Sequence, residues 1–278
     1  MRKWILFFIA FYAPLHMQAD ENYTTPSSTQ QNSLLFHYQK TYSQFGEEGI
    51  LDEILNRLQI KNGFFVEFGG WDAHYLSNTR FLAERGWGGV FIEADSKLHE
   101  QAKINCSHLP KVQCICEFVT SNYKDHRGKM LDQIADQFFP NEEIDVLSID
   151  IDGADYLILE TLKRKPKIII IEGGLEWFPL VTTRIPDFIA KDQRNQPLPV
   201  IFDIAKKKGY KPVCFTINTF LVREDLAAPF MNIQNDPMTL WFDSWYYYEK
   251  VAPQISNYVR EVRKTDSWIQ QYDHYQIP

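Results

Sequence analysis

Residues 64–72 read Phe64-Phe65-Val66-Glu67-Phe68-Gly69-Gly70-Trp71-Asp72. This apolar run carries one carboxylate, Glu67, and breaks at two glycines, Gly69 and Gly70. Such a run is typical of a buried strand in a parallel sheet. Glycines at its end let the backbone turn tightly and let a ligand come close to the main chain. The stretch therefore predicts the carboxyl end of a buried strand, followed by a ligand-binding loop.

A second acidic residue, Glu93, ends the run Gly89-Val90-Phe91-Ile92-Glu93. In nucleotide-binding sheets, an acid about 20 residues beyond the glycine-rich turn binds the ribose hydroxyls. Glu93 stands at about that separation from Gly69 and Gly70. The two strand ends predict a nucleoside-type cofactor at the carboxyl edge of a doubly wound sheet. The alternative is a plain turn between a strand and a helix.

The loop also limits which cofactor fits. A dinucleotide fingerprint needs a second glycine where the main chain touches the pyrophosphate. Here the bulky Trp71 stands two places after Gly69, so NAD and FAD are disfavoured. The sequence holds no G-x-x-x-x-G-K-[ST] motif, so it has no P-loop. A cofactor with a ribose but no phosphate fits better, and S-adenosylmethionine (SAM) is the common one.

Apolar runs alternate with helical patterns along most of the chain. The predicted strands are residues 64–68, 90–92, 112–116, 144–149 and 167–171, with helices in each interval. This order predicts an α/β fold with a doubly wound, mostly parallel sheet and helices on both faces. Residues 173–200 read as a long loop, typical of a lid or binding loop. A helix at 200–208, an antiparallel hairpin of strands 211–216 and 220–223, and an amphipathic helix over 244–271 are expected to follow.

The composition and the N-terminal sequence limit the partners and the cellular location of the protein. The chain has 278 residues and a net charge of −7, and the absence of a basic patch argues against a nucleic-acid partner. A basic start, an apolar run over residues 4–15 and the small Ala19 predict a signal peptide at 1–19. We therefore expect an exported protein, whether secreted, periplasmic or lumenal. A membrane anchor formed by residues 4–15 is the alternative.

A flexible leader is predicted over residues 20–40, a catalytic domain over 41–243 and a helical extension over 244–278. The four cysteines are Cys106, Cys114, Cys116 and Cys214. Buried thiols are favoured over a disulfide framework, because a chain of this size does not depend on disulfides.

Three further carboxylates follow predicted strands. Asp150 and Asp152 are two residues apart, so both side chains are expected on one face, and Glu172 ends the neighbouring strand. Such a group can hold a divalent cation such as Mg²⁺ through oxygen ligands, or supply a general base with a raised pKa. Asp150, Asp152 and Glu172 are therefore the candidate catalytic and metal-binding residues. The alternative for Asp152, which precedes Gly153, is a helix N-cap.

Five ordered motifs between residues 41 and 225 resemble those of FkbM-type methyltransferases. They are Ser43-Gln44-Phe45-Gly46-Glu47-Glu48-Gly49-Ile50-Leu51, Phe65-Val66-Glu67-Phe68-Gly69, Leu76-Ser77-Asn78-Thr79, Gly86-Trp87-Gly88-Gly89-Val90-Phe91-Ile92-Glu93 and Leu147-Ser148-Ile149-Asp150-Ile151-Asp152-Gly153. The resemblance implies a class I SAM-dependent methyltransferase fold, with seven strands and a closing antiparallel hairpin. It also implies methyl transfer to a hydroxyl, often on a sugar or polyketide.

By this resemblance, Glu67, Gly69 and Gly70 line the methionine and ribose side of SAM. Glu93 binds the ribose hydroxyls, and Asp150 lies near the reacting centre. Asp72, two residues after Gly70, Asn78, in the third motif, and Asp150 complete the expected cofactor-binding set. The sequence departs from the wider superfamily at Trp71 and Ala73, where glycine is frequent.

We therefore expect a SAM-dependent O-methyltransferase whose partner is a small-molecule or glycan substrate. The rival hypothesis is a non-catalytic exported protein that uses this fold for binding or trafficking. A membrane partner is expected only if the N-terminal segment is retained. The sequence leaves the methyl acceptor and the oligomeric state open.

Overall fold

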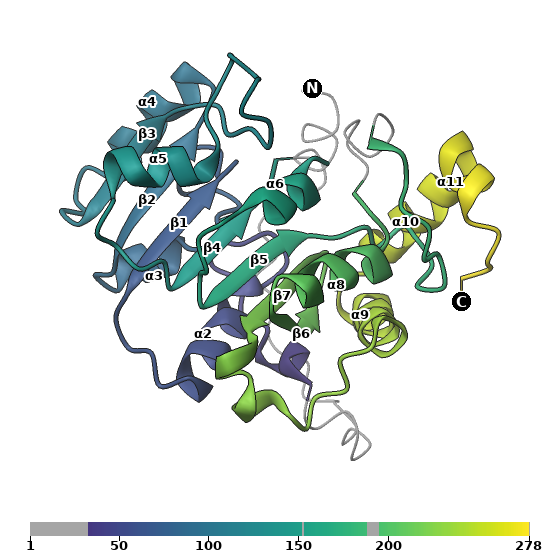
Figure 1. The fold of residues 1–278 in the computed structure, drawn as a ribbon. Coiled ribbons are helices and arrows are strands. Elements are labelled where there is room, and N and C mark those ends of the chain that lie inside the picture. Colours follow the sequence, from purple (N-terminus) through teal and green to yellow (C-terminus); the bar gives the residue numbers. More distant parts are fainter. Residues whose placement is uncertain (1–32, 152, 188–194, 278) are drawn as a thin grey trace. The chain divides into compact units, whose positions relative to one another are not determined.

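The computed structural model describes residues 33–151, 153–187 and 195–277, within a compact unit that begins at Ser33. Its centre is a seven-stranded sheet in the order β3-β2-β1-β4-β5-β7-β6 (Figure 1). The strands are β1 Phe64–Phe68, β2 Gly88–Glu93, β3 Val112–Cys116, β4 Val146–Ile149, β5 Ile168–Glu172, β6 Tyr210–Phe215 and β7 Asn218–Arg223. Strands β1 to β5 are parallel, and β7 is antiparallel to both β5 and β6. The predicted Rossmann-like methyltransferase sheet with its closing hairpin is confirmed.

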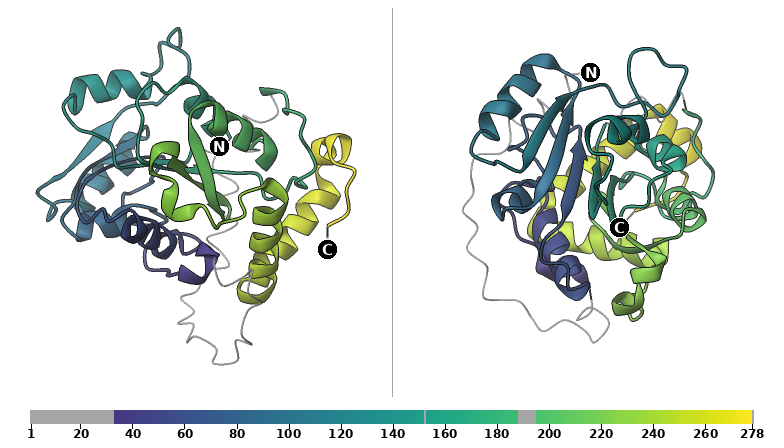
Figure 2. Two further views of the ribbon diagram at one scale, coloured as in Figure 1. Left: turned by 60° about the horizontal axis from the view of Figure 1, so that its bottom comes forward. Right: turned by 60° about the vertical axis from the view of Figure 1, so that its left-hand side comes forward.

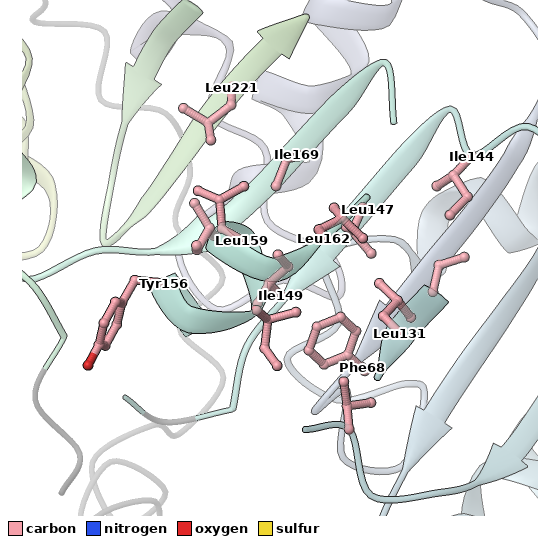
Figure 3. Close-up of a cluster of buried hydrophobic side chains, with 14 of the residues drawn as sticks. Phe68, Leu131, Ile144, Leu147, Ile149, Tyr156, Leu159, Leu162, Ile169 and Leu221 are labelled. Atoms are coloured by element: carbon pink, nitrogen blue, oxygen red, sulfur yellow. The ribbon is translucent and has the colours of Figure 1, made fainter. Parts of the chain in front are cut away.

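Helices cover both faces of this sheet. They are α2 Glu47–Arg57, α3 Arg80–Glu84, α4 Ser96–Asn105, α5 Leu131–Phe138, α6 Asp155–Thr161 and α8 Leu198–Lys207. Alternate residues of each buried strand point to opposite faces. Ile169 and Ile171 of β5 therefore pack with α5, α6 and α8, while Ile168 and Ile170 pack with α2, α3 and α4. Figure 3 shows the first cluster, in which Phe68 and Ile149 meet Leu131 and Leu159.

A third cluster joins the C-terminal helices to the sheet (Figure 2). Trp241, Trp245 and Tyr248 of α9 (Pro237–Val251) are buried with Phe215 of β6 and Phe202 of α8. The indole rings of Trp241 and Trp245 stack, with centroids 5.2 Å apart. The expectation that this aromatic stripe forms core packing is confirmed.

The C-terminal segment is helical, as expected, but it is divided. Instead of one helix over 244–271, the chain forms α9, α10 (Pro253–Thr265) and α11 (Ser267–Tyr272). Pro253 explains the first break, because proline has no N–H to donate and clashes with the preceding turn. Helix α9 also begins at Pro237, seven residues before the predicted limit of the extension.

The N-terminal part differs from the expected flexible leader where the structure describes it. Ser33 caps a short 3-10 helix, η2 (Leu34–His37), and Leu34 and Leu35 are buried in the cluster beneath α2. Two further 3-10 turns, η3 (Glu224–Leu226) and η4 (Ala228–Phe230), connect β7 to α9. The predicted signal peptide or anchor lies outside the described residues. Among the residues described, no helix is both long and apolar enough to cross a membrane.

Candidate active site

The site is built at the carboxyl ends of β1, β2, β4 and β5, where the sequence places its acidic residues. Glu67 of β1 is buried on the face that carries Phe65. Its Oε2 accepts hydrogen bonds from Ser77 Oγ (2.8 Å), Thr79 N (3.0 Å) and Thr79 Oγ1, and its Oε1 accepts one from Asn78 N (3.0 Å). Burial raises the pKa of Glu67, and these hydrogen bonds oppose that shift. The structure therefore shows Glu67 as the anchor of residues 77–79, a role that sequence reasoning did not foresee.

The segment between β1 and α3 has an unusual backbone. Besides Gly69, three residues with side chains have positive φ: Trp71 (54°), Ala73 (58°) and Leu76 (61°). Left-handed backbone is costly for residues with a Cβ, and such conformations concentrate at functional sites. Trp71 and Ala73 are the two positions where the sequence departs from the glycines frequent in the superfamily. The loop keeps the glycine-like backbone there despite the side chains.

Gly69 has a clear steric reason to be glycine. Its φ is +78°, and a Cβ built on it would overlap the carbonyl oxygen of Asp150 in β4's exit loop. A Cβ on Gly70 would lie 3.3 Å from Cγ of Glu67, which is tight but less severe. The glycines thus allow the β1 and β4 loops to meet closely. This packing requirement explains Gly69 with or without a bound cofactor.

Asp72 and Asn78 hold the same loop in place. Oδ1 of Asp72 accepts from the backbone N–H of His74 (3.0 Å) and Tyr75 (2.8 Å), which closes a tight turn. Asn78 is buried, and its Nδ2 donates to Ser148 Oγ of β4 at 3.1 Å. The structure thus places both predicted cofactor residues in contacts that shape the loop.

Arg80, at the start of α3, also forms a hydrogen bond to this loop. Its guanidinium is buried, although arginine is rarely buried without partners. Nη1 donates to the Ala73 carbonyl (2.8 Å), Nη2 donates to the Asn105 carbonyl (3.0 Å), and Glu84 pairs with Nε and Nη2. The left-handed Ala73 is thereby tied to the end of α4.

Glu93 ends β2 next to this loop. Strand β2 pairs with β1 in parallel, with Phe68 beside Ile92, and Gly69 N donates to the Ile92 carbonyl at 3.3 Å. The side chain is partly buried, and one oxygen accepts the N–H of Asp95 at 2.8 Å. Burial raises the pKa of Glu93, while the backbone hydrogen bonds oppose it. Glu93 is therefore placed as predicted, as an acidic residue at the mouth of the β1 loop.

On the other side of β1, three carboxylates come together. Oxygens of Asp150, Asp155 and Glu172 all lie within 4.8 Å of one another. Asp150 and Glu172 were expected in this group, whereas Asp152 lies outside the described residues. Asp155 is the buried third member, and its two oxygens accept from Ile151 N (2.8 Å) and Gly153 N (2.9 Å). Its role as an anchor of the loop was missed, because it reads in sequence as an ordinary first-turn acid of α6.

The N-cap alternative for Asp152 lies outside the described residues, as Asp152 itself does. The N-cap position of α6 is Ala154, and the N–H groups of Ile151 and Gly153 donate to Asp155. The cluster of Asp150, Asp155 and Glu172 has the oxygen-only donor set that Mg²⁺ prefers.

Two asparagines that sequence reasoning missed flank Glu172. Asn195 Nδ2 donates to Glu172 Oε2 at 2.7 Å, and Asn218 of β7 is the cross-strand neighbour of Glu172. Asn218 Nδ2 donates to Glu47 Oε1 at 3.2 Å. Within the described part of the chain, the buried amide oxygens of Asn195 and Asn218 accept no hydrogen bond. No local motif marks either residue, because the folded hairpin and loop bring them beside β5.

Glu47, in the motif of residues 43–51, accepts hydrogen bonds from residues at this end of the sheet. It is fully buried at the start of α2 and accepts from Phe45 N (2.7 Å), Thr216 Oγ1 (3.0 Å) and Asn218. Burial raises its pKa, and these hydrogen bonds oppose the shift. Glu47 therefore links helix α2 to the turn between β6 and β7.

A separate hollow lies between α6 and α8. It is lined by Glu160, Arg184, Asp203 and Lys207, among others. Pro199 and Lys208 lie at opposite ends of α8, so the hollow runs along the length of this helix. Its lining, within the described residues, does not include the predicted cofactor residues Glu67, Gly69, Gly70 and Glu93.

No model of a known protein family matches the chain, and no curated protein matches it. Solved structures with a similar arrangement include an O-methyltransferase from Bacillus cereus in complex with SAH, at 14% identity, 73% and 94% coverage of this chain and that one, and a TM-score of 0.38. A SAM-dependent methyltransferase from Aquifex aeolicus has 14% identity, 62% and 86% coverage and a TM-score of 0.37. A TehB-like SAM-dependent methyltransferase from Corynebacterium glutamicum has 10% identity, 66% and 89% coverage and a TM-score of 0.39. At such low scores, the fold assignment rests on the strand order, and function has to be argued from the site.

Proposed function

We propose that this chain is a SAM-dependent O-methyltransferase that acts on a hydroxyl of a sugar, glycan or small natural product. The observation that carries the proposal is the loop of residues 69–79. Its left-handed backbone is held by Glu67, Asn78 and Arg80 directly beside Glu93, in a sheet of the 3-2-1-4-5-7-6 order. In this arrangement Glu93 accepts the ribose hydroxyls, and the backbone at Gly69 and Gly70 borders the methionine part of SAM.

The other half of the edge supports a hydroxyl acceptor. The buried amide oxygens of Asn195 and Asn218, beside Glu172, accept no hydrogen bond within the described residues, which favours a ligand that brings donors. A neutral hydroxyl compound supplies such O–H donors, whereas an anionic acceptor would meet like charge. Buried acceptors without partners cost about 1–3 kcal/mol each, so a bound hydroxyl that satisfies them gains affinity.

The chemistry that follows is a direct displacement. SAM supplies an activated methyl group, and the enzyme must hold the acceptor oxygen about 3 Å from it and in line. The acceptor oxygen forms the new bond to the methyl carbon as the bond from that carbon to sulfur breaks. Asp150, at the end of β4, takes the hydroxyl proton. If Asp150 and Glu172 hold Mg²⁺ instead, the ion would orient the hydroxyl and lower its pKa.

Substitution of Asp150 tests the proposed chemistry. Asp150→Asn should keep the melting temperature and lose about 10²–10⁴-fold in transfer of labelled methyl from SAM to a panel of simple sugars and glycosides. Asp155→Asn is the matched comparison, because asparagine keeps only one acceptor oxygen, and loss of one of the two backbone hydrogen bonds should lower the melting temperature as well. Chelation followed by Mg²⁺ or Mn²⁺ distinguishes the metal-dependent version. Unchanged turnover in Asp150→Asn and Glu172→Asn would contradict a role for these carboxylates.

The proposed setting is outside the cytosol, by way of the signal peptide at residues 1–19. What supports it is the sequence pattern of a basic start, an apolar run and Ala19. Retention of residues 4–15 as an anchor is the competing outcome.

A further inference from the structure

A short segment that leads into α2, residues 42–47, connects the two halves of the candidate site and is here called the bridging segment. At one end, the ring of Tyr42 meets the ring of His74 in the β1 loop edge-on, with centroids 5.3 Å apart. At the other end, Glu47 accepts from Nδ2 of Asn218, the first residue of β7. The segment therefore crosses the carboxyl edge of the sheet from the proposed cofactor loop to the side of the acceptor.

The acceptor half of the site lies on the face of the sheet that α2 covers. Ile170 and Phe220 belong to the apolar cluster packed with this helix. Glu172 lies two residues after Ile170 on β5, so it points to the same face. Asn218 is the cross-strand neighbour of Glu172 and lies two residues before Phe220, so it shares that face. The bridging segment and these side chains are thus on one side of the sheet.

Two buried glutamates at the start of α2 hold the bridging segment in place. Oε2 of Glu48 accepts from the backbone N–H of Tyr42 and of Ser43, at 2.9 Å each. Oε2 of Glu47 accepts from the N–H of Phe45 at 2.7 Å. Because the backbone is tied at both ends, the side chains between them have defined positions, as selective binding of a ligand requires.

Gln44 is the residue of this segment whose side chain can serve a ligand. Its neighbours Ser43 and Phe45 are buried, whereas Gln44 is partly exposed. Its amide makes no hydrogen bond within the described part of the chain. An amide both donates and accepts, so it can pair with a hydroxyl in either direction. The buried carboxylates beside it disfavour an anionic ligand and leave a neutral one as the better partner.

We propose that Gln44 is a specificity-determining residue for the methyl acceptor, and that its amide hydrogen-bonds a hydroxyl of a neutral, sugar-like compound. This role rests on the proposed function, which supplies the hydroxyl acceptor. The compound lies between the bridging segment and the ends of β5 and β7. There the buried Oδ1 of Asn218, which accepts no hydrogen bond from the described residues, is a second partner for it.

The test compares Gln44→Ala with Gln39→Ala in the full chain. Gln39 is exposed and lies just before the bridging segment, so the same change there is the matched control. Both variants should keep the wild-type melting temperature, because neither side chain makes a hydrogen bond in the described structure. Calorimetry measures the binding of SAM. Shifts in melting temperature measure the binding of simple sugars and glycosides, with the demethylated product of SAM present so that no transfer occurs. General stabilisation by sugars cancels between the two variants.

Gln44→Ala should weaken the binding of a sugar that wild type binds by about 3–10-fold, as expected for one lost hydrogen bond. In transfer assays it should raise the KM of the acceptor more than it lowers kcat. Its affinity for SAM should equal that of wild type.

The proposal is wrong if Gln44→Ala binds the sugars as wild type does, if it loses SAM affinity, or if Gln39→Ala shows the same loss. Wild-type protein that binds none of the sugars would also contradict it. Sugar binding without methyl transfer would contradict the proposed activity alone, and the comparison of the two variants would still decide the role of Gln44.

Discussion

At the scale of single residues, the proposed role of Glu93 predicts that SAM binding is sensitive to pH. Burial raises its pKa above the ordinary value of 4.5. Ribose hydroxyls donate to the ionised carboxylate, so SAM binding is favoured when Glu93 is deprotonated. We predict that affinity for SAM is highest near neutral pH and falls as the pH drops through the raised pKa, above the range of an ordinary glutamate. Calorimetric titrations at a series of pH values from the ordinary pKa of 4.5 up to neutral pH measure this.

The matched variants for this prediction are Glu93→Gln and Glu100→Gln. Glutamine at 93 should weaken binding and flatten its pH dependence, because it does not titrate. Glu100 is exposed on α4, so its variant should keep the wild-type profile. A pH dependence that survives unchanged in Glu93→Gln would contradict the assignment of this effect to Glu93.

The acidic residues at the strand ends could be predicted from the sequence, but the groups that donate hydrogen bonds to them could not. Glu67, Glu93, Asp150 and Glu172 lie at the edge where the pattern of apolar runs put them. The sequence could not predict that residues 77–79 donate hydrogen bonds to Glu67. Those hydrogen bonds depend on how the loop folds back onto the strand. Asn195 and Asn218 are further cases, since no sequence period connects them with Glu172.

At the scale of elements, the close approach of the β1 and β4 loops makes Gly69 critical. Gly69→Ala should destabilise the protein by more than about 3 kcal/mol, because the Cβ overlaps the Asp150 carbonyl and the residue is left-handed. Gly86→Ala is the control, with φ of +83° and open space around its Cβ. It should cost only about 1–2 kcal/mol. Urea denaturation measures both, and equal losses would contradict the close contact between the loops.

Helices and strands could be predicted where the periodic spacing of their apolar residues was uninterrupted. The five parallel strands and the hairpin appear in the expected order, because long apolar runs with glycine or acidic ends leave few alternatives. The prediction of a single C-terminal helix was wrong. The apolar spacing continues through Pro253, but the helical backbone cannot continue through a proline. The sequence analysis included the short η2 helix in the flexible leader. Its two apolar residues, Leu34 and Leu35, are too few to show a helical period.

At the scale of the whole molecule, the sequence divides into a predicted signal peptide with its leader and a folded unit. The described unit begins at Ser33, so a signal peptide ending at Ala19 would leave the fold intact. We predict that protein recovered after expression with its native N-terminus begins at Asp20 or within a few residues of it. N-terminal sequencing of the secreted fraction measures this. Recovery of Met1 in a membrane fraction would instead support an anchor at residues 4–15.

The central claim is that the carboxyl edge binds SAM between the β1 loop and Glu93. Isothermal titration calorimetry of the purified protein with SAM, and with its demethylated product, tests it most directly. We predict one site for each ligand and a loss of roughly 10–100-fold in affinity in Glu93→Ala, since a charge-assisted hydrogen bond contributes about 1.5–3 kcal/mol. Folded wild-type protein that gives no binding heat at millimolar SAM would contradict the claim and favour a non-catalytic binding role.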